Sequence, residues 1–158
     1  MLGLFKKEKI VEFKAPVTGE IVDLVEVPDE VFAGKMVGDG VAIKPETGEL
    51  FAPVNSEVVQ VFPTKHAIGL RTKEGLEVLI HIGIDTVEMR GEGFKSFVQP
   101  NQRVKAGEKL MEFDLKLIAE KAKSTLIPLL ITNMDAVKDL KFYNGKVTPH
   151  NTVMKVKI

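Results

Sequence analysis

Two stretches of the chain repeat one short pattern, and that pattern favours a β fold. Residues 15–24 read APVTGEIVDL and residues 52–61 read APVNSEVVQV, an offset of 37 residues. In each copy a turn that contains proline leads into a run rich in β-branched side chains, which are typical of strands. Two copies are too few for a solenoid. We therefore predict a duplicated strand motif within one β core.

Turn signals divide the rest of the chain into short segments. They include Gly38-Asp-Gly40, Lys73-Glu-Gly75, Lys105-Ala-Gly107 and Asn144-Gly145. Many short β-branched runs between such turns indicate an antiparallel sandwich or barrel. No linker or low-complexity tract interrupts the chain. We predict an all-β, single-domain antiparallel β-sandwich or barrel over residues 11–158, with one or two short helices and a flexible N-terminal tail at residues 1–10.

The composition excludes several classes of protein. The chain has 158 residues, with 22 Lys and Arg against 22 Asp and Glu. This balance argues against a nucleic-acid-binding protein, which normally has a basic excess or stripe. The chain has no cysteine, so disulfides, thiolate nucleophiles and cysteine zinc sites are excluded. No apolar run approaches the ~20 residues of a membrane span, and the N-terminus lacks the apolar core of a signal peptide. We expect a cytoplasmic protein.

Only two segments have apolar residues at helical spacing. The first is residues 115–123, LKLIAEKAK. The second is residues 134–141, for which Asn133 is a candidate N-cap. Both are predicted to be packing elements without a chemical role.

Two of the three histidines fall in one predicted β-hairpin. His66 and His81 lie on either side of the turn at Lys73-Glu-Gly75. A two-residue turn places the two side chains opposite or diagonal on one face, with Cβ atoms at most about 7–8 Å apart. A loop with an odd number of residues places them on opposite faces. The third histidine, His150, lies in a turn and is expected to be exposed.

A histidine pair in this position has more than one chemical use. Two neutral imidazoles bind a metal, or one is a nucleophile while the other donates a hydrogen bond to an incoming anion. Thr64, on the same face of an extended strand as His66, is placed to fix the tautomer of that ring. Gly69 and Gly83 flank the pair and would leave open space above it. These residues alone leave a plainer interpretation open, in which each histidine is a partly buried sheet residue with a satisfied hydrogen bond.

Six motifs in fixed order carry a resemblance to a known family. They are Val27-Pro-Asp-Glu-Val-Phe32, Met36-Val-Gly-Asp-Gly-Val-Ala-Ile-Lys-Pro45, Thr64-Lys-His66, His81-Ile-Gly-Ile-Asp-Thr-Val87, Gly91-Glu-Gly-Phe-Lys95 and Ala122-Lys-Ser-Thr125. From about Val11 to Ile158, the chain resembles the glucose-type enzyme IIA of the bacterial phosphoenolpyruvate-dependent sugar phosphotransferase system. The resemblance implies an antiparallel β-sandwich with a shallow active-site depression and the activity of a histidine phosphocarrier, formally a transferase.

The resemblance also implies a role for each residue of the pair. His81 is the nucleophile that carries a covalent phosphoryl group on Nε2, His66 donates a hydrogen bond to the phosphate, and Thr64 orients His66. The group comes from the phosphocarrier HPr and passes to the IIB domain of a glucose-type sugar permease. Such a transfer requires in-line positioning and stabilisation of charged oxygens. No metal ion, nucleotide or other cofactor is expected.

An apolar rim around the histidines is the implied docking surface for these partners. Its apolar members are Val31, Phe32, Met36, Val37, Phe62 and Val87, and its acidic members are Asp29 and Asp85. Neighbours such as Val31 and Phe32 cannot both point inward in an extended chain, so we expect part of the rim to be exposed. The acidic residues favour a basic partner surface and a faster encounter.

The N-terminus departs from some members of the family. Some relatives are fused to the permease, whereas this chain begins with Met1 and has neither membrane spans nor a IIB-type cysteine. We therefore expect a free-standing IIA. Residues 2–7, LGLFKK, resemble the short membrane-seeking tail of some members. A segment of this length gives at most weak membrane contact.

Three other functions remain as alternatives. Lysostaphin-like zinc metallopeptidases share a related β fold, and His81-Ile-Gly-Ile-Asp85 satisfies their HxxxD motif, but the chain has no HxH. Biotinyl and lipoyl carriers share the turn at Lys105-Ala-Gly107 but need a modifiable lysine, and the chain has no Met-Lys-Met. A regulatory binding role accompanies phosphotransfer in some relatives, in which the equivalents of His66 and His81 share an intermolecular zinc with a partner carboxylate.

Overall fold

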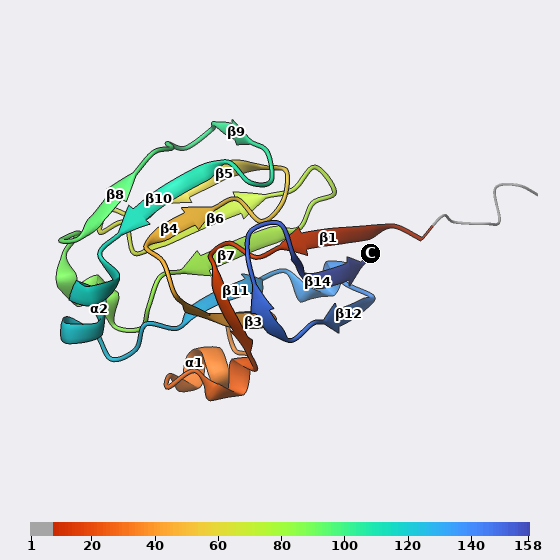
Figure 1. Ribbon diagram of the computed structural model, residues 1–158. Coiled ribbons are helices and arrows are strands. Elements are labelled where there is room, and N and C mark those ends of the chain that lie inside the picture. The colour runs from red at the N-terminus through yellow and green to blue at the C-terminus, as the bar shows by residue number, and fades with distance from the viewer. Residues whose placement is uncertain (1–7) are drawn as a thin grey trace, which may run out of the picture.

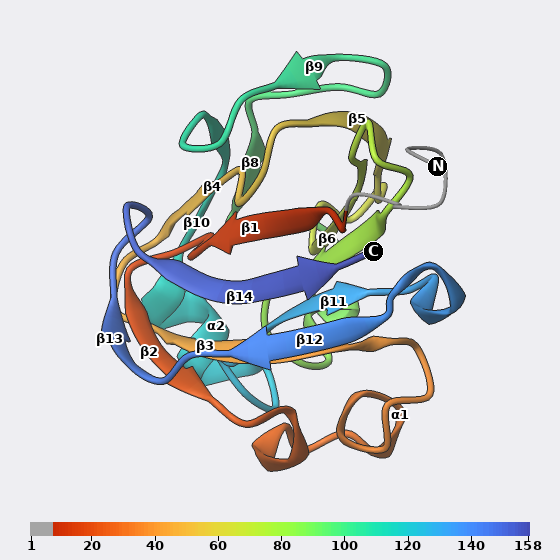
Figure 2. The same ribbon diagram turned by 90° about the vertical axis from the view of Figure 1, so that its right-hand side faces the viewer.

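The computed structural model describes residues 8–158, which form three antiparallel sheets (Figure 1). The largest has the strand order β13 (Gly145–Val147), β2 (Gly19–Val22), β3 (Asp39–Pro45), β11 (Ile127–Ile131), β7 (Glu77–His81), β6 (Ala67–Arg71), β5 (Ser56–Val61), β9 (Arg103–Val104). The other two have the orders β1 (Ile10–Lys14), β14 (Thr152–Lys157), β12 (Asp139–Phe142) and β4 (Glu49–Phe51), β10 (Lys109–Phe113), β8 (Phe94–Ser96). Figure 2 shows β14 between β1 and β12. The predicted single-domain antiparallel β-sandwich is confirmed.

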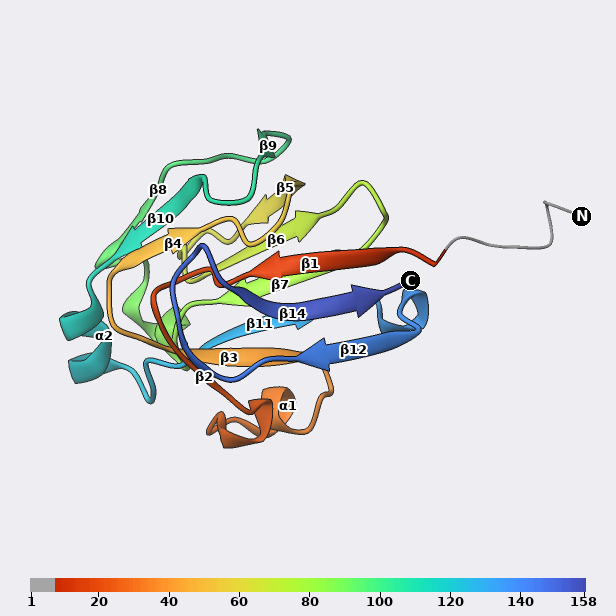
Figure 3. The ribbon, with the colours of Figure 1, turned by 45° about the vertical axis from the view of Figure 1, so that its right-hand side comes forward.

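The helices of the described residues are short and lie outside the sheets. The α-helices are α1 (Glu30–Ala33) and α2 (Leu115–Lys121), and the 3-10 turns are η2 (Leu24–Glu26), η3 (Thr86–Met89) and η4 (Met134–Ala136). Figure 3 shows α1 beneath β3, and α2 at the left-hand end of the molecule, directly after the end of β10. The predicted helix at residues 115–123 is confirmed as α2.

The second predicted helix, at residues 134–141, is wrong. Only η4 is helical there, and the chain continues as strand β12, which pairs with β14. Asn133 does not cap η4 with its side chain. Its side-chain amide instead accepts from the backbone N–H of Glu77 and donates to the carbonyl of Gly75. The segment gains a sheet partner and a tie to the β6–β7 turn, which outweigh a weak local helix preference.

The duplicated motif forms a reciprocal contact at the centre of the fold. The backbone N–H of Lys14 donates to the carbonyl of Pro53 at 2.8 Å, and that of Phe51 donates to Pro16 at 2.7 Å. Both donors and acceptors are related by the 37-residue offset of the sequence repeat. The two copies therefore pack against each other about a local two-fold relation, as a duplicated strand motif predicts.

Two apolar clusters of unequal size lie on either side of the largest sheet. The larger fills the space between the sheets, with side chains such as Phe13, Leu50 and Met111 fully buried. The smaller consists of Leu24, Val27, Phe32, Ala42, Ile84 and Leu130. It covers the other face of β3 and β11 and fixes η2 and α1 there, because burying these side chains removes apolar area from water. This smaller cluster sets the position of α1 next to the end of β7.

The β6–β7 hairpin has a loop with an odd number of residues, the case in which the sequence placed the two histidines on opposite faces. The loop residues Lys73-Glu-Gly75 lie between Thr72 and Leu76, and Gly75 has φ +95°. Ala67 therefore stands opposite His81. In a regular hairpin of this register the two histidine side chains would lie on opposite faces. The structure nevertheless brings their rings together.

The N-terminal tail was predicted for residues 1–10, and residues 1–7 of it lie outside the described residues. Glu8 and Lys9 precede β1, and the carbonyl of Lys9 accepts from the backbone N–H of Ile158. The weak membrane contact predicted for residues 2–7 falls on the undescribed part. In residues 8–158 there is no helix with the length and apolarity needed to span a membrane.

Candidate active site

The ring of His81, at the end of β7, is held by the backbone carbonyl of Gly83, two residues further along the chain. Its Nδ1 lies 2.6 Å from the carbonyl oxygen of Gly83. A carbonyl oxygen only accepts, so Nδ1 carries the proton and donates it to this bond. In the neutral ring Nε2 then keeps its lone pair, which makes Nε2 the nucleophilic atom.

Gly83 can take its position only because it lacks a side chain. Its φ is +74°, and a Cβ there would come within 2.7 Å of Thr86 Cγ2 and 3.0 Å of the Ser124 carbonyl oxygen. The prediction that Gly83 leaves open space above the histidines is therefore wrong, because this glycine permits close packing. At Gly69 a Cβ would be in ordinary contact with Gln60, at 3.8 Å.

His66 lies next to His81 although it precedes strand β6. The two ring centroids are 4.9 Å apart and the ring planes meet at 73°. Thr64 Oγ1 is hydrogen-bonded to Nδ1 of His66. The predicted Thr64–His66 contact is present, but both residues lie in the turn before β6, whereas the sequence interpretation put them on an extended strand.

Four rings form a row across this face of the molecule. The Phe62 ring lies 5.4 Å from that of His66, and the Phe32 ring lies 5.0 Å from that of His81. His66 is buried, with 6% of its surface exposed, whereas His81 is half-buried. The two phenylalanines therefore shield the outer sides of the histidine pair.

Both histidines are shifted toward the neutral form. Burial lowers the pKa of His66 to about 4, and repulsion from a positively charged His81 adds to this effect. Burial also lowers the pKa of His81, against the hydrogen bond to the Gly83 carbonyl and the negative charges of Asp29 and Asp85, which raise it. Near neutral pH the pair therefore presents two uncharged imidazoles, which is the form in which a ring nitrogen attacks an electrophile.

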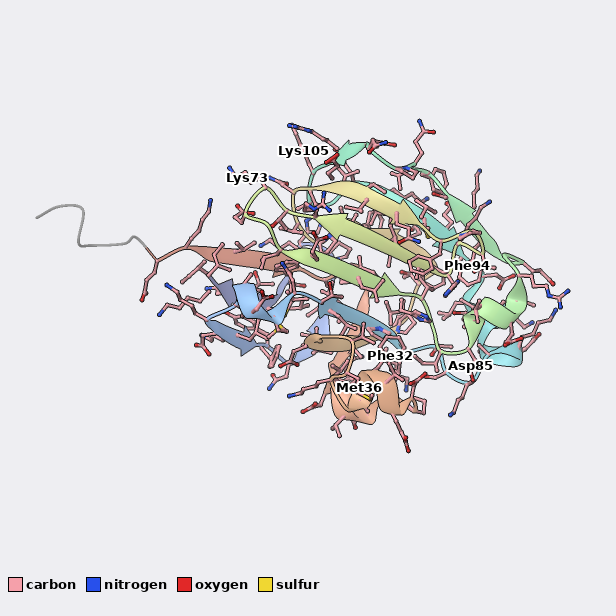
Figure 4. The ribbon with its side chains drawn as sticks, turned by 180° about the vertical axis from the view of Figure 1, so that it is seen from behind. Phe32, Met36, Lys73, Asp85, Phe94 and Lys105 are labelled. Atoms are coloured by element: carbon pink, nitrogen blue, oxygen red, sulfur yellow. The ribbon has the colours of Figure 1, made fainter. Side chains whose placement is uncertain are left out.

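The predicted rim is partly exposed and partly buried. Val31, Met36 and Val87 are exposed, at 44%, 75% and 47%, whereas Phe32 is buried in the smaller apolar cluster. Val37 and Phe62 are half-buried. In Figure 4 the labelled Phe32 and Met36 lie at the α1 segment, and Asp85 follows the end of β7.

The two acidic residues of the rim begin short helical segments beside the histidines. Asp29 is the N-cap of α1 and accepts from the backbone N–H of Val31 at 2.9 Å. Asp85 precedes η3 with φ +63°. The sequence argument for an exposed member of the pair Val31 and Phe32 considered an extended chain, whereas both residues lie in α1. The helix separates the directions of these neighbours, with the first exposed and the second buried.

Metal chemistry finds limited support in these side chains. Across residues 8–158 no group of three or more His, Cys, Asp and Glu side chains is arranged to hold a metal ion. His66 and His81 offer two nitrogens, so a zinc ion shared with a partner carboxylate stays a prediction. His150 is exposed, as expected.

Sequence reasoning missed the Gly83 carbonyl and the backbone of Lys65. Lys65 has φ +58° and lies between Thr64 and His66. A glycine two residues after a candidate nucleophile was a usable signal for the first, since glycine often marks a special backbone conformation. Nothing in the sequence signals a left-handed lysine.

Known proteins match this chain over most of its length. The family model described as phosphoenolpyruvate-dependent sugar phosphotransferase system, EIIA 1, matches residues 11–137. A glucose-specific EIIA component of the PTS system from Bacillus cereus is 51% identical over 158 residues, which cover 99% of this chain and 96% of the relative.

A longer relative and a solved structure give similar matches. A glucoside-specific EIICBA component of the PTS system from Staphylococcus carnosus is 53% identical over 133 residues, 84% of this chain but 19% of the relative. The glucose permease IIA from Mycoplasma capricolum is similar in structure with a TM-score of 0.89 and 45% identity, over 93% of this chain and 96% of that chain.

Proposed function

The chain belongs to the EIIA 1 family of the phosphoenolpyruvate-dependent sugar phosphotransferase system, and on that premise we propose that His81 is its phosphoryl carrier. Components of this family are phosphotransferase relay components. The observation that supports His81 most directly is the bond from its Nδ1–H to the Gly83 carbonyl, next to a second neutral histidine. This bond leaves Nε2 unprotonated and pointed away from its own backbone support.

The proposed transfer balances without any cofactor. Nε2 of His81 attacks the phosphorus atom of a phosphorylated donor, a new N–P bond forms, and the bond from phosphorus to the donor breaks. Positive charge develops on the His81 ring as its lone pair is used. The Gly83 carbonyl and the carboxylates of Asp29 and Asp85 stabilise this charge, since each of them favours the charged ring.

His66 acts in this proposal as a hydrogen-bond donor to the phosphoryl oxygens. If the Thr64 hydroxyl donates to Nδ1 of His66, the proton of the neutral ring lies on Nε2. The low pKa of His66 keeps the ring in that neutral form. A neutral donor stabilises the oxygens without binding the phosphoryl group so tightly that onward transfer stops.

The donor and the acceptor in the proposal are HPr and the IIB part of a sugar permease. The second partner is supported by the match to a longer EIICBA component, whose name joins the IIC and IIB parts to a IIA part in one protein. Exposed Val31, Met36 and Val87, together with Asp29 and Asp85 near His81, provide an apolar and acidic surface that suits a basic partner. Both partners would use this same surface in turn, because both must reach His81.

The test is phosphorylation of the purified chain by phosphoenolpyruvate, enzyme I and HPr. Peptides are mapped by mass spectrometry at neutral or alkaline pH, because phosphohistidine is labile to acid. We expect the phosphate on His81, and its loss in His81→Gln. The matched control is His150→Gln, which changes the exposed third histidine and leaves labelling intact. Labelling on another residue, or none with active donors, would refute the proposal.

The second histidine is tested by separating the two transfers. His66→Gln should still accept phosphate at His81. Its onward transfer to a IIB domain should fall by roughly 10²–10³-fold, the usual effect of removing one donor to a developing oxyanion. Wild-type rates in both transfers would contradict a paired-histidine mechanism.

A further inference from the structure

Regular strand geometry does not explain why His66 lies beside His81. The β6–β7 ladder pairs Ala67 with His81 and Ile68 with Ile80. Ile68 and Ile80 are fully buried, and Ala67 and His81 share the other face. The ladder continues one step further, because the backbone N–H of Ile82 donates to the carbonyl of His66 at 2.7 Å. By alternation the His66 side chain would then lie on the face of Ile82, away from His81.

The backbone leaves that alternation at the residue before His66. Lys65 has φ +58°, the left-handed region that side chains other than glycine rarely adopt. Its N–H donates to the carbonyl of Phe62 at 2.7 Å, and the N–H of Phe62 donates to the carbonyl of Ala67 at 3.1 Å. These two bonds close the turn before β6 around a single left-handed residue, and such irregularities next to strands re-aim a side chain.

The turn is also supported from the neighbouring loop. Gly91, with φ +87°, lies beside Thr64, and a Cβ added there would be in ordinary contact with the Thr64 carbonyl oxygen, at 3.7 Å. Thr64 in turn holds Nδ1 of His66. Thr64, the residue immediately before Lys65, therefore lies between the Gly91 loop and the His66 ring.

We propose that Lys65 is a positioning residue, whose left-handed backbone turns the His66 ring out of the strand alternation and against the His81 ring. Lys65 acts through its conformation and not through its charge. The effect on phosphoryl transfer rests on the proposed function, but the effect on the His66 ring does not. Strained backbone at functional sites is a common way of fixing such geometry.

Three substitutions of Lys65 separate conformation from charge, because all three remove the ammonium group. Lys65→Gly and Lys65→Asn keep access to the left-handed region, whereas the β-branched side chain in Lys65→Val disfavours it. Asn101→Val is the matched control, since Asn101 is also left-handed, with φ +74°, and is exposed in a turn outside the site. It reports the effect of the same kind of strain on stability alone.

The first readout is the pKa and tautomer of His66, measured by nitrogen NMR on the unphosphorylated protein. In Lys65→Val we expect the pKa of His66 to rise from its low value toward 6.5, because the ring leaves its buried place beside His81. Lys65→Gly, Lys65→Asn and Asn101→Val should keep the low value. An unchanged His66 in Lys65→Val, or an equal change in all three Lys65 variants, would overturn the proposal.

The second readout is onward phosphoryl transfer. Lys65→Val should lose about as much onward transfer as His66→Gln, roughly 10²-fold or more, while Lys65→Asn stays within about 2-fold of the wild type. If the wild type carries no phosphate at all, the proposed function fails, and the NMR comparison still decides the role of Lys65. If the wild type transfers normally and Lys65→Val does too, the positioning role is wrong.

Discussion

At the scale of single residues, the protonation of two imidazoles decides what the site can do. His81 is held by one backbone carbonyl, and His66 by one hydroxyl. Each of these contacts uses Nδ1, so the geometry leaves both Nε2 atoms available for chemistry. The neighbouring rings of Phe32 and Phe62 exclude water from the outer sides of the pair and thereby favour the neutral forms.

The depressed pKa of His66 predicts a loss of stability in mild acid. The folded value is about 4 and the unfolded value is 6.5, so between these values the unfolded chain binds more protons. Stability therefore rises as pH increases through this window and falls as pH decreases, by an amount on the order of 1–3 kcal/mol for this group. Urea unfolding of wild type and His66→Gln across the window measures it.

The pH result has a clear opposing outcome. His66→Gln lacks the titrating ring, so its stability should change less between pH 6.5 and about 4 than that of the wild type. His150→Gln, at an exposed site, should follow the wild type. Equal slopes in wild type and His66→Gln would mean that the ring is not depressed.

At the scale of elements, the loop after β7 combines a hydrogen-bond acceptor with close packing. Thr86 Oγ1, fully buried, donates to the Ile82 carbonyl at 2.7 Å and closes the turn that contains Gly83. The backbone N–H of Ile84 donates to the Ser124 carbonyl at 2.9 Å and ties the loop to the segment before β11. The Gly83 carbonyl is therefore fixed before any partner arrives.

Gly83→Ala should destabilise the protein by more than the backbone strain of a left-handed alanine accounts for. The new alanine would have to adopt φ +74°, and its Cβ would lie 2.7 Å from Thr86 Cγ2. Gly107→Ala has a similar φ of +92° and nothing within 4 Å, so it reports strain without a clash. We expect Gly107→Ala to cost about 1 kcal/mol and Gly83→Ala about 1–3 kcal/mol more in urea unfolding. Equal losses would show that the close contact at Gly83 carries no cost.

The cap of α1 links a short helix to the electrostatics of the site. Asp29→Asn keeps a capping side chain but removes the charge, so the helix should hold, while the pKa of His81 falls further because Asp29 raises it. Asp29→Ala also removes the cap and should cost about 1 kcal/mol in addition. NMR titration of His81 and urea unfolding separate the two effects. An unchanged pKa of His81 in both variants would contradict the role of this carboxylate.

At the scale of the whole molecule, the exposed apolar residues near the histidines are held on a rigid base. Met36 is 75% exposed at the end of the α1 segment, and Phe32 anchors that segment in the smaller apolar cluster. His81 is the last residue of β7, which is held in the largest sheet between β11 and β6. Exposed contact residues on a fixed support cost little to order when a partner binds.

Met36→Ser should therefore impair docking without impairing folding. We expect the free energy of unfolding to stay within about 0.5 kcal/mol of the wild type, because the side chain is exposed. The kcat/KM for phosphorylation by phospho-HPr should fall roughly 5–10-fold, because docking is weakened. Val59→Ser, at a site that is 38% exposed on β5, is the control and should change neither quantity. A wild-type rate for Met36→Ser would remove this residue from the docking surface.

The sequence alone predicted features that depend on neighbouring residues. The duplicated motif, the turn at Lys73-Glu-Gly75 and the helix that begins at Leu115 follow from local turn chemistry and apolar spacing. The predicted hairpin singled out Thr64, His66 and His81, and six motifs in fixed order were enough to indicate the family and to imply a role for each of these residues. Local preferences of this kind are fixed within a few residues along the chain.

Only the tertiary structure decided how distant parts meet. The odd loop of the β6–β7 hairpin would have separated the histidines, and a left-handed Lys65 brings them together. Residues 139–142 became a strand because β14 offers hydrogen bonds that outweigh their weak helical pattern. Phe32 is buried because α1 turns it into a cluster with β3 and β11. Each of these outcomes depends on contacts between residues far apart in sequence, whose combined energy exceeds local preference and leaves no trace in the spacing of single residues.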